Sequence, residues 1–433
     1  MTRLDLPEDA GREALVGFRR LLHRHCEVAF TEIYAAALIR QVLGDLTTAH
    51  PDIDLRAGAD VLRADAVINY PDAAARKAAA ERAIGFGVDA VLATQIASEG
   101  TAVVLDIPGN SPGPLVGLRF DIDGLPVVES TDPAHLPTRE GFACTDGVMH
   151  ACGHDGHTAM GLVLARRLAA DRDFAGTVRL IFQPAEESVR GATAMIAAGV
   201  ADGIAEFYGL HLGESLPLGT IAACGPGLMA TVKFQATMHG ANAHAAGSPQ
   251  LGRNAVAAAA TAVLGILALS RDARGNTVTN VGRIEGGASA NTIPDRCHFT
   301  AEVRSVHSDA CDDLFTRAEA AVAGAAAMWG CTSQLQVTSR CRTFTASEEA
   351  VEIAYGAAHD VGATTVLRSS PMNASDDLAE WALETQQDGG IATFLIVGAS
   401  SPGPHHSPTF DVAEDALTIG ADWLEAIVRR QRR

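Results

Sequence analysis

The chain is short of positive charge. Its 33 lysines and arginines face 52 aspartates and glutamates, which leaves a formal net charge of −19. A nucleic-acid-binding protein needs a basic face, so this balance argues against that class. It does not exclude an anionic small molecule, because a local arginine can override the field of the whole protein.

Two other features are missing, a long apolar run and a disulfide framework. Without about 18 consecutive apolar residues, no membrane-spanning helix is expected. Residues 1–9 also lack the apolar core of a signal peptide. The eight cysteines follow no framework spacing, so we expect reduced, mostly buried thiols in a cytoplasmic protein, with Cys152 as the exception.

Length and composition are those of a soluble enzyme. Hydrophobic residues make up 47% and charged residues 20%. A chain of 433 residues is too long for one ordinary core, so two domains are expected.

One short segment concentrates the chemistry. Residues 149–157 contain a thiol, three imidazoles and a carboxylate, and Glu186 and Glu187 follow about thirty residues later, after an apolar strand. Cysteine, histidine and glutamate hold zinc and manganese. A carboxylate beside a ligand carboxylate suits a general base that acts on a metal-activated water. The pattern favours a hydrolase with a two-metal centre, and the alternative for each motif taken singly is a chance occurrence on the surface.

Further polar residues lie beside predicted strands or in the N-terminal helical region. Asp121 and Asp123 end a strand and either orient a ligand imidazole or cap a turn. His211 lies in an apolar strand and is either a core histidine or a ligand at the same sheet edge. For His23, His25 and Glu32, in the helical region 10–47, we favour solvated helix faces or packing near the cleft.

The order of predicted elements indicates an α/β protein with an insertion. Residues 48–98 read as an insertion that carries an exposed helix and no evident chemistry. Strands at 101–105, 114–120, 178–182, 207–212 and 392–397 alternate with helices at 158–170 and 412–429.

Between about 226 and 339 the predicted order is β-α-β-β-α-β, which is the ferredoxin-like arrangement. We therefore expect a catalytic domain formed by residues 1–225 and 340–433, with an inserted domain at 226–339.

The assembled motifs resemble the M20 metallopeptidase family, and its amidohydrolase branch in particular. They are GLRFDIDGLP, MHACGHDGHTAM, FQPAEE, GLHLG, the stretch 240–255, GGASANTIP, EVRS and HSPTFDVAEDAL, and they span nearly the whole length. Within this branch, which includes N-acyl-amino-acid, hippurate and auxin-conjugate hydrolases, the chain is most similar to the large subunit of aminobenzoyl-glutamate hydrolase. The resemblance implies a dinuclear-metal catalytic α/β/α domain with an inserted ferredoxin-like α+β lid and dimerisation domain.

The resemblance also implies roles for individual residues. The implied metal ligands are Cys152 (bridging), His154, Glu187, His211 and His406. Glu186 matches the general base and His244 the lid histidine that donates to the oxyanion. Asn291 and Arg304 match the lid residues that hold the substrate carboxylate. His405 is the neighbouring alternative to His406, while His150, Asp155 and His157 are expected behind the ligands.

The expected activity is hydrolysis of the amide bond of N-acyl or N-aroyl amino acids. The alternatives are a dipeptidase of the same family and a non-catalytic partner subunit. The expected cofactors are two divalent metal ions, zinc or manganese, with cobalt as a further alternative. Arg190 and Lys233 either recognise a second, acidic carboxylate of the substrate or are solvated surface charges. A homodimer through the lid domain is expected, with a hetero-oligomer or a monomer as alternatives.

Overall fold

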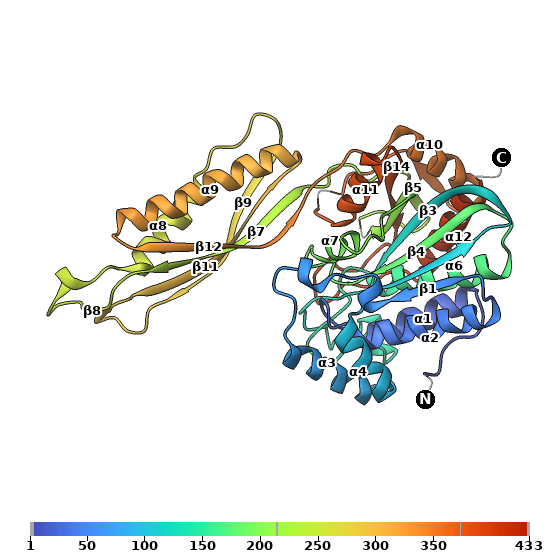
Figure 1. Cartoon of the computed structure of the whole chain (residues 1–433), viewed down its shortest axis with the longest axis horizontal. Coiled ribbons are helices and arrows are strands. Elements are labelled where there is room, and N and C mark those ends of the chain that lie inside the picture. Colours follow the sequence, from blue (N-terminus) through green and yellow to red (C-terminus); the bar gives the residue numbers. More distant parts are fainter. Residues whose placement is uncertain (1–3, 214, 373, 431–433) are drawn as a thin grey trace. The chain divides into compact units, whose positions relative to one another are not determined.

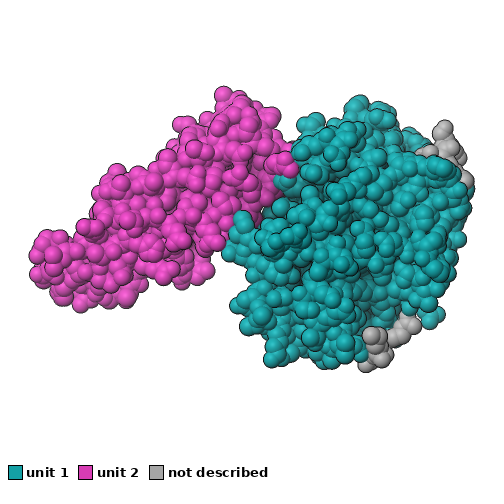
Figure 2. All heavy atoms as spheres, viewed as in Figure 1, with its two compact units in different colours: residues 1–226, 344–372, 377–433 teal, residues 227–343, 373–376 magenta. Residues whose placement is uncertain are grey.

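The computed structural model describes residues 4–213, 215–372 and 374–430. The chain divides into two compact units, which Figure 2 colours separately. Unit 1 comprises residues 1–226, 344–372 and 377–433, and unit 2 comprises residues 227–343 and 373–376. The sequence placed the boundaries near 225 and 340, and did not anticipate that residues 373–376 belong to unit 2.

Unit 1 is built on a twisted mixed sheet, eight-stranded within the described residues, in the order β1-β2-β4-β3-β5-β14-β6-β13 (Figure 1). The strands are β1 (Asp54–Ala57), β2 (Val103–Pro108), β3 (Ser111–Asp121), β4 (Ala175–Gln183), β5 (Ile204–Gly213), β6 (Thr220–Ala222), β13 (Thr365–Leu367) and β14 (Ile391–Gly398). The central strands β4, β3, β5 and β14 run parallel to one another. Parallel strands need helices on both faces, which explains their nearly continuous apolar sequences.

The helices of unit 1 are α1 (Arg12–Arg24), α2 (Ile33–Ala49), α3 (Ala73–Gly85), α4 (Ala90–Glu99), α5 (Leu136–Arg139), α6 (His154–Ala170), α7 (Gly191–Ile196), α10 (Glu348–Ala357), α11 (Leu378–Gln387) and α12 (Asp415–Arg430). They include those that form these two layers and a further pair, α3 and α4, that packs outside α2 (Figure 1). Strand β5 shows how its alternating side chains serve both layers. Leu212 lies against Gly156 of α6, whereas Gly209 lies against Leu378 of α11.

Unit 2 is a four-stranded antiparallel sheet, in the order β12-β7-β11-β9, packed against two helices. Its elements in chain order are β7 (Ala230–His239), β8 (Ala243–His244), α8 (Ala255–Leu267), β9 (Thr277–Gly286), β10 (Thr292–Ile293), β11 (Arg296–Ser305), α9 (Ser308–Met328) and β12 (Thr332–Cys341). Leaving aside the short β8–β10 pair, this is the predicted ferredoxin-like order. The predicted fold class is therefore confirmed.

Two expectations from the sequence need correction. Helix α6 begins at His154 rather than Thr158. Its first turn is polar, so apolar periodicity does not indicate it. The region 48–98 contains α3 and α4, but also the edge strand β1, which pairs with β2 in the main sheet.

Two further observations bear on the expectations from composition. All eight cysteines are free thiols, as predicted. None of the helices in the described part of the chain has the length and apolar content of a membrane span.

Candidate functional site

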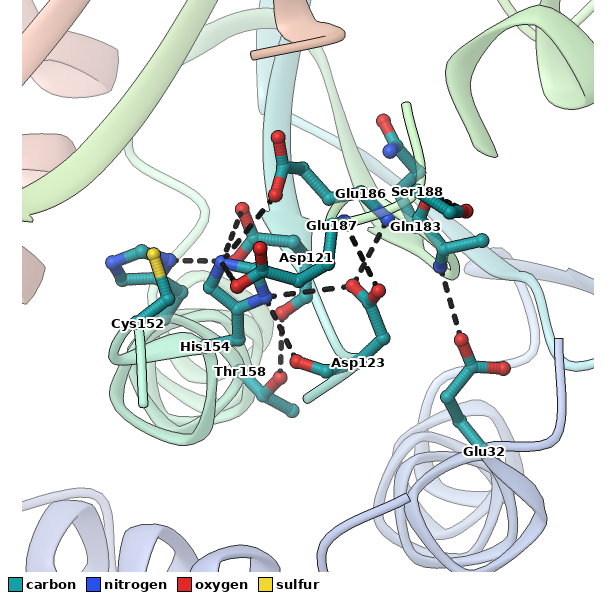
Figure 3. Close-up of polar contacts among 12 residues, drawn as sticks. Glu32, Asp121, Asp123, Cys152, His154, Thr158, Gln183, Glu186, Glu187 and Ser188 are labelled. Carbon is teal, nitrogen blue, oxygen red and sulfur yellow. Dashed lines mark hydrogen bonds and ion pairs between the residues drawn. The ribbon is translucent and has the colours of Figure 1, made fainter. Parts of the chain in front are cut away.

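The carboxyl ends of the four parallel strands form one edge of the unit 1 sheet, where α/β proteins bind their ligands. Polar residues follow or end each of these strands: Asp121 and Asp123 at β3, Glu186 and Glu187 after β4, His211 at β5, and His405 and His406 after β14. Cys152 and His154 join them from the turn that starts α6, whose N-cap Gly153 has a left-handed φ of 91°. The topology thus gathers residues that are far apart in the sequence (Figure 3).

The predicted metal ligands lie together. The ligand atoms of Cys152, His154 and His211 lie within 4.8 Å of one another, as do those of Cys152, Glu187 and His406. The Sγ atom of Cys152 is 3.5 Å from Nε2 of His211. Nε2 of His406 is 3.4 Å from Oε2 of Glu187. All five residues belong to unit 1.

Hydrogen bonds define which nitrogen of each buried histidine is available. Nδ1 of His154 lies 2.8 Å from the backbone carbonyl of Asp123, and Nδ1 of His211 lies 2.9 Å from that of Leu212. A carbonyl only accepts, so each Nδ1 carries a proton, and Nε2 is the nitrogen of each neutral ring that is left to bind a metal. This is the orienting alternative for Asp123, made by its backbone rather than its carboxylate.

His157 has the same tautomer, but neither of its ring nitrogens is available for a metal. Its Nε2 accepts from the backbone N–H of Leu212 at 3.0 Å, so Nδ1 carries the proton and donates to Asp121 at 2.6 Å. Both ring nitrogens are therefore occupied within the chain. This geometry agrees with the expectation that His157 lies behind the ligands and supports the surrounding structure.

The electrostatics of the site call for cations. Burial, and then the charge of Glu187, raise the pKa of Cys152 well above its usual value, so the thiol would not ionise without a compensating positive charge. Burial alone would lower the pKa of His154, yet the charge of Asp121 and the bond to Asp123 raise it well above normal. Burial lowers the pKa of His211 well below its usual value, which leaves the neutral imidazole that a metal requires.

Two buried polar atoms in the site have no hydrogen-bond partner among the described residues, Nε2 of His154 and Oε1 of Glu187. They lie 3.8 Å from each other. Buried polar atoms are almost always paired, so an unpaired imidazole nitrogen and an unpaired carboxylate oxygen that face one another mark a place for a bound group. With the thiol and the other imidazoles beside them, these residues fit divalent metal ions of borderline softness.

The loop that carries Glu186 is held through its backbone. The carboxylate of Asp123 accepts from the N–H groups of Glu186 at 2.9 Å and Glu187 at 3.1 Å (Figure 3). Oε2 of Glu186 lies 3.7 Å from Nε2 of His154. The loop closes tightly, since a Cβ on Gly191 would lie 1.7 Å from the carbonyl oxygen of Pro184. The base predicted from the sequence therefore stands beside the predicted ligands.

Behind the site lies a buried charge network that sequence reasoning missed. Arg19 donates to Asp155 at 3.1 Å and also to Asp411, while His23 lies 2.8 Å from Asp155 and 3.0 Å from Glu129. Burial would lower the pKa of His23, but these two carboxylates raise it to about 9. The expected solvated face for His23 is wrong, and the packing alternative is right. Only the pairing in three dimensions distinguishes these charges from surface ones.

The remaining predicted residues lie in unit 2. His244 and Asn291 are neighbours there, because β8 pairs with β10 and the N–H of Ala245 donates to the carbonyl of Asn291. Nδ1 of His244 accepts from the N–H of Gly247 at 2.8 Å, so the neutral ring carries its proton on the exposed Nε2. Arg304 donates to Glu302 at 2.9 Å.

Arg190 is not the solvated surface charge that was one of the two alternatives for it. Its guanidinium donates to the carbonyls of Ile68 and Asn69 and to Ser188, and lies over the ring of Phe30. It therefore ties the insertion to the segment after Glu187 instead of standing as a solvated charge. No local motif signals this role, because its partners are backbone carbonyls more than a hundred residues away.

Comparison with known proteins agrees with these observations. The sequence profile of peptidase family M20/M25/M40 matches residues 117–430. The chain belongs to this family. The indole-3-acetyl-aspartic acid hydrolase of Enterobacter agglomerans is 35% identical, with 94% of this chain and 93% of that protein covered. A p-aminobenzoyl-glutamate hydrolase subunit from Escherichia coli is 33% identical, again with 94% and 93% covered.

Solved structures extend the comparison of this M20 member. An aminobenzoyl-glutamate utilization protein from Klebsiella pneumoniae superposes with a TM-score of 0.82 at 30% identity, covering 96% of each chain. A dinuclear metal binding peptidase of the M20 family from Bacillus subtilis gives a TM-score of 0.66 at 25% identity, covering 97% and 98%. The predicted enzyme class, a metal-dependent amidohydrolase, and the predicted family are confirmed.

Proposed function

We propose that this M20 enzyme hydrolyses the amide bond that joins an acyl or aroyl group to an acidic amino acid. The observation that carries the proposal is the set of available lone pairs at the sheet edge, with Glu186 beside them. The two hydrolases named above act on conjugates of aspartate and glutamate with aromatic acids. Their likeness extends over nearly the whole chain, so we carry that substrate class to this protein.

Cys152, His154, Glu187, His211 and His406 are the proposed ligands of two divalent ions. Zinc or manganese suits this mixture of sulfur, nitrogen and oxygen donors, and cobalt is an alternative. Such ions, when bound, acidify water and polarise the scissile carbonyl. His405 is less suited, because its ring packs against Phe410 and the ligand atoms that cluster with Cys152 and Glu187 are those of His406.

The chain's own residues supply the proton transfers. Glu186 takes a proton from the attacking water and passes it to the departing amine. His244, with its proton on Nε2, donates to the oxygen that gains negative charge. Arg304 and Asn291 hold the α-carboxylate of the amino-acid half through charged and neutral hydrogen bonds.

A panel assay tests the proposal. Purified protein is analysed for bound metal and then supplied with acyl and aroyl conjugates of glutamate, aspartate and alanine, and with dipeptides. We expect about two divalent ions per chain and release of glutamate or aspartate in preference to alanine. Faster hydrolysis of dipeptides would favour the dipeptidase alternative. Bound metal without hydrolysis of any member would favour a non-catalytic subunit.

We also propose that unit 2 pairs with a second copy. It exposes apolar side chains on α8 and on its edge strand β9, namely Leu264, Leu267, Val278 and Ile284. An open edge leaves backbone groups unmatched and favours pairing. The Escherichia coli relative is named as one subunit of its hydrolase, which makes pairing with a different chain the alternative.

We propose a cytoplasmic location for the protein, because its eight free thiols suit a reducing compartment.

A further inference from the structure

Glu32 stands at the N-cap of α2 but does not cap that helix. Two N–H groups of the first turn, which have no partner within the helix, are instead bonded to Glu27, which accepts from Tyr34 at 2.8 Å and Ala35 at 3.1 Å. The carboxyl group of Glu32 is thereby left for other partners. It is fully buried, which is costly for an acidic group unless the site is built to use it.

One of the three partners of Glu32, Ala185, lies on the loop that carries the proposed base. Its Oε1 accepts from the N–H of Ala185 at 3.0 Å and of Phe30 at 2.9 Å. Its Oε2 accepts from the hydroxyl of Thr101 at 2.8 Å. Ala185 directly precedes Glu186, and Figure 3 shows Glu32 reaching this backbone from below.

The loop at residues 185–189 needs these hydrogen bonds because its backbone is strained. Ala185 has a φ of 61° and Val189 a φ of 57°, in the left-handed region that side chains disfavour and β-branched residues rarely adopt. Strain of this kind persists only where the surroundings impose it. Three buried carboxyl groups do so here through backbone N–H groups: Glu32 at Ala185, Asp123 at Glu186 and Glu187, and Asp377 at Ala192.

We propose that Glu32 is a positioning residue for Glu186, which it holds in its catalytic orientation by fixing the left-handed turn at Ala185. The proposal rests on Glu186 being the base of the proposed hydrolysis. Glu32 touches neither the substrate nor the proposed ligands, so its contribution lies in where Glu186 is held. A misplacement of about 1 Å in a reacting group can lower turnover about 100-fold, even when the mutated residue is remote.

The protonation of Glu32 suits this role. Burial, and then the charge of Asp123, raise its pKa to about 8, so the group is largely neutral at pH 7. A neutral carboxyl group keeps one oxygen for the two N–H groups without adding a third charge near Asp123 and Glu187. Glutamine has the same shape and offers the same acceptor oxygen, so Glu32→Gln should preserve the function.

The experiment compares Glu32→Ala, Glu32→Gln and Glu32→Asp with Glu27→Ala and Glu186→Gln. Glu27 is the matched control, since it is equally buried, accepts two backbone N–H groups, and has a pKa raised to about 8 by burial, but does not contact the loop. The readouts are bound metal, thermal midpoint, kcat and KM. The substrate is p-aminobenzoyl-glutamate or indole-3-acetyl-aspartate, whichever the wild-type protein hydrolyses faster. Hydrogen exchange of the peptide at 183–191 is measured alongside.

We expect Glu32→Ala to lower kcat about 10- to 100-fold while KM changes less than about threefold and bound metal is unchanged. Exchange at 183–191 should rise in Glu32→Ala and remain normal in Glu32→Gln, which should also retain kcat. Glu27→Ala should lower the thermal midpoint without lowering kcat. If Glu32→Ala fails to fold, Glu32→Asp, which is too short to span the same contacts, should show the loss that Glu32→Gln does not.

Two kinds of failure are distinguishable. Normal kcat and normal exchange at 183–191 in Glu32→Ala, or in Glu32→Asp if the former does not fold, would overturn the proposal, provided that Glu186→Gln is inactive. Normal turnover by Glu186→Gln would overturn the proposed function instead. An equal loss of kcat in Glu27→Ala would show that any buried carboxyl group of this region matters, and would also overturn the proposal.

Discussion

The proposed catalytic residues of unit 1 and unit 2 are held in contrasting ways. In unit 1, His154 and Glu186 are buried, and the backbone that carries them is fixed by further buried groups such as Asp123. In unit 2, His244 and Asn291 are exposed, and their contacts are local turns and a two-residue strand pair. Unit 1 is thus organised before any ligand arrives, whereas the unit 2 residues have few contacts that restrict them.

The two units would thus contribute to catalysis in different ways: unit 1 through a fixed, buried geometry, and unit 2 through exposed side chains that can move. Burying carboxyl groups that repel one another destabilises the fold, so their presence in unit 1 indicates selection for geometry over stability. An exposed histidine costs little stability and is free to respond to substrate or to a second chain. Substitutions of the buried groups that hold the Glu186 loop of unit 1 should therefore affect stability and activity together, whereas substitutions in unit 2 should affect them separately.

The largest expected effect is on turnover after Glu186→Gln. The substitution removes the proposed base and leaves the backbone contacts to Asp123 and the proposed ligands intact. We expect kcat to fall about 10²–10⁴-fold with bound metal unchanged, measured by steady-state kinetics and metal analysis. Near-normal kcat would show that Glu186 is not the general base, although it is buried beside the proposed ligands.

The next effect concerns His244. Removing a donor to the oxyanion typically lowers kcat about 10²–10³-fold, so His244→Ala should approach that loss. If the site is shared within a homodimer, mixing His244→Ala with Glu186→Gln under conditions of subunit exchange should restore one working site per mixed dimer. Subunit exchange without return of activity would assign His244 to its own chain or to no catalytic role.

The fold and the positions of the main motifs could be predicted from the sequence. The strands β3, β4, β5 and β14 are apolar segments of adequate length, and each ends in a recognisable polar motif, so the fold and the gathering of the motifs were predictable. The ferredoxin-like order of unit 2 was equally clear from alternating periodicities. The start of α6 was misplaced because His154, Asp155 and His157 interrupt the apolar pattern at its first turn.

The support behind the motifs could not be predicted. Glu32, His23 and Arg190 act through backbone groups or charges that lie tens to hundreds of residues away. Glu27, six residues before α2 begins, accepts from the first turn of that helix, and no local sequence signal indicates this contact. Such assignments depend on which groups burial leaves without another partner, and that is a property of the packed structure.

A third prediction concerns pH and the network behind the site. His23 has a pKa of about 9 when folded, and an unfolded histidine titrates near 6.5. Its contribution to stability is therefore complete below about pH 6.5 and is lost as the pH rises through 9. The upper bound on this loss is about 3 kcal/mol. Chemical denaturation across this range should show a steeper decline for the wild-type protein than for His23→Gln. Parallel curves would contradict a charged His23.

The smallest expected effect tests unit 2 alone. Asn254 caps α8 by accepting from the N–H of Ala257 at 3.0 Å, whereas the side chain of His244 is exposed and accepts from the turn that follows it. Loss of such a cap costs about 1 kcal/mol, so Asn254→Ala should lower the stability of unit 2 by that amount and leave kcat near normal. His244→Ala should do the reverse, with turnover lost and the unfolding free energy changed by less than about 0.5 kcal/mol. Denaturation and kinetics of the two variants side by side decide the matter. If His244→Ala destabilises as much as Asn254→Ala, then His244 belongs to the structure of unit 2, and the contrast with unit 1 is smaller than its exposure suggests.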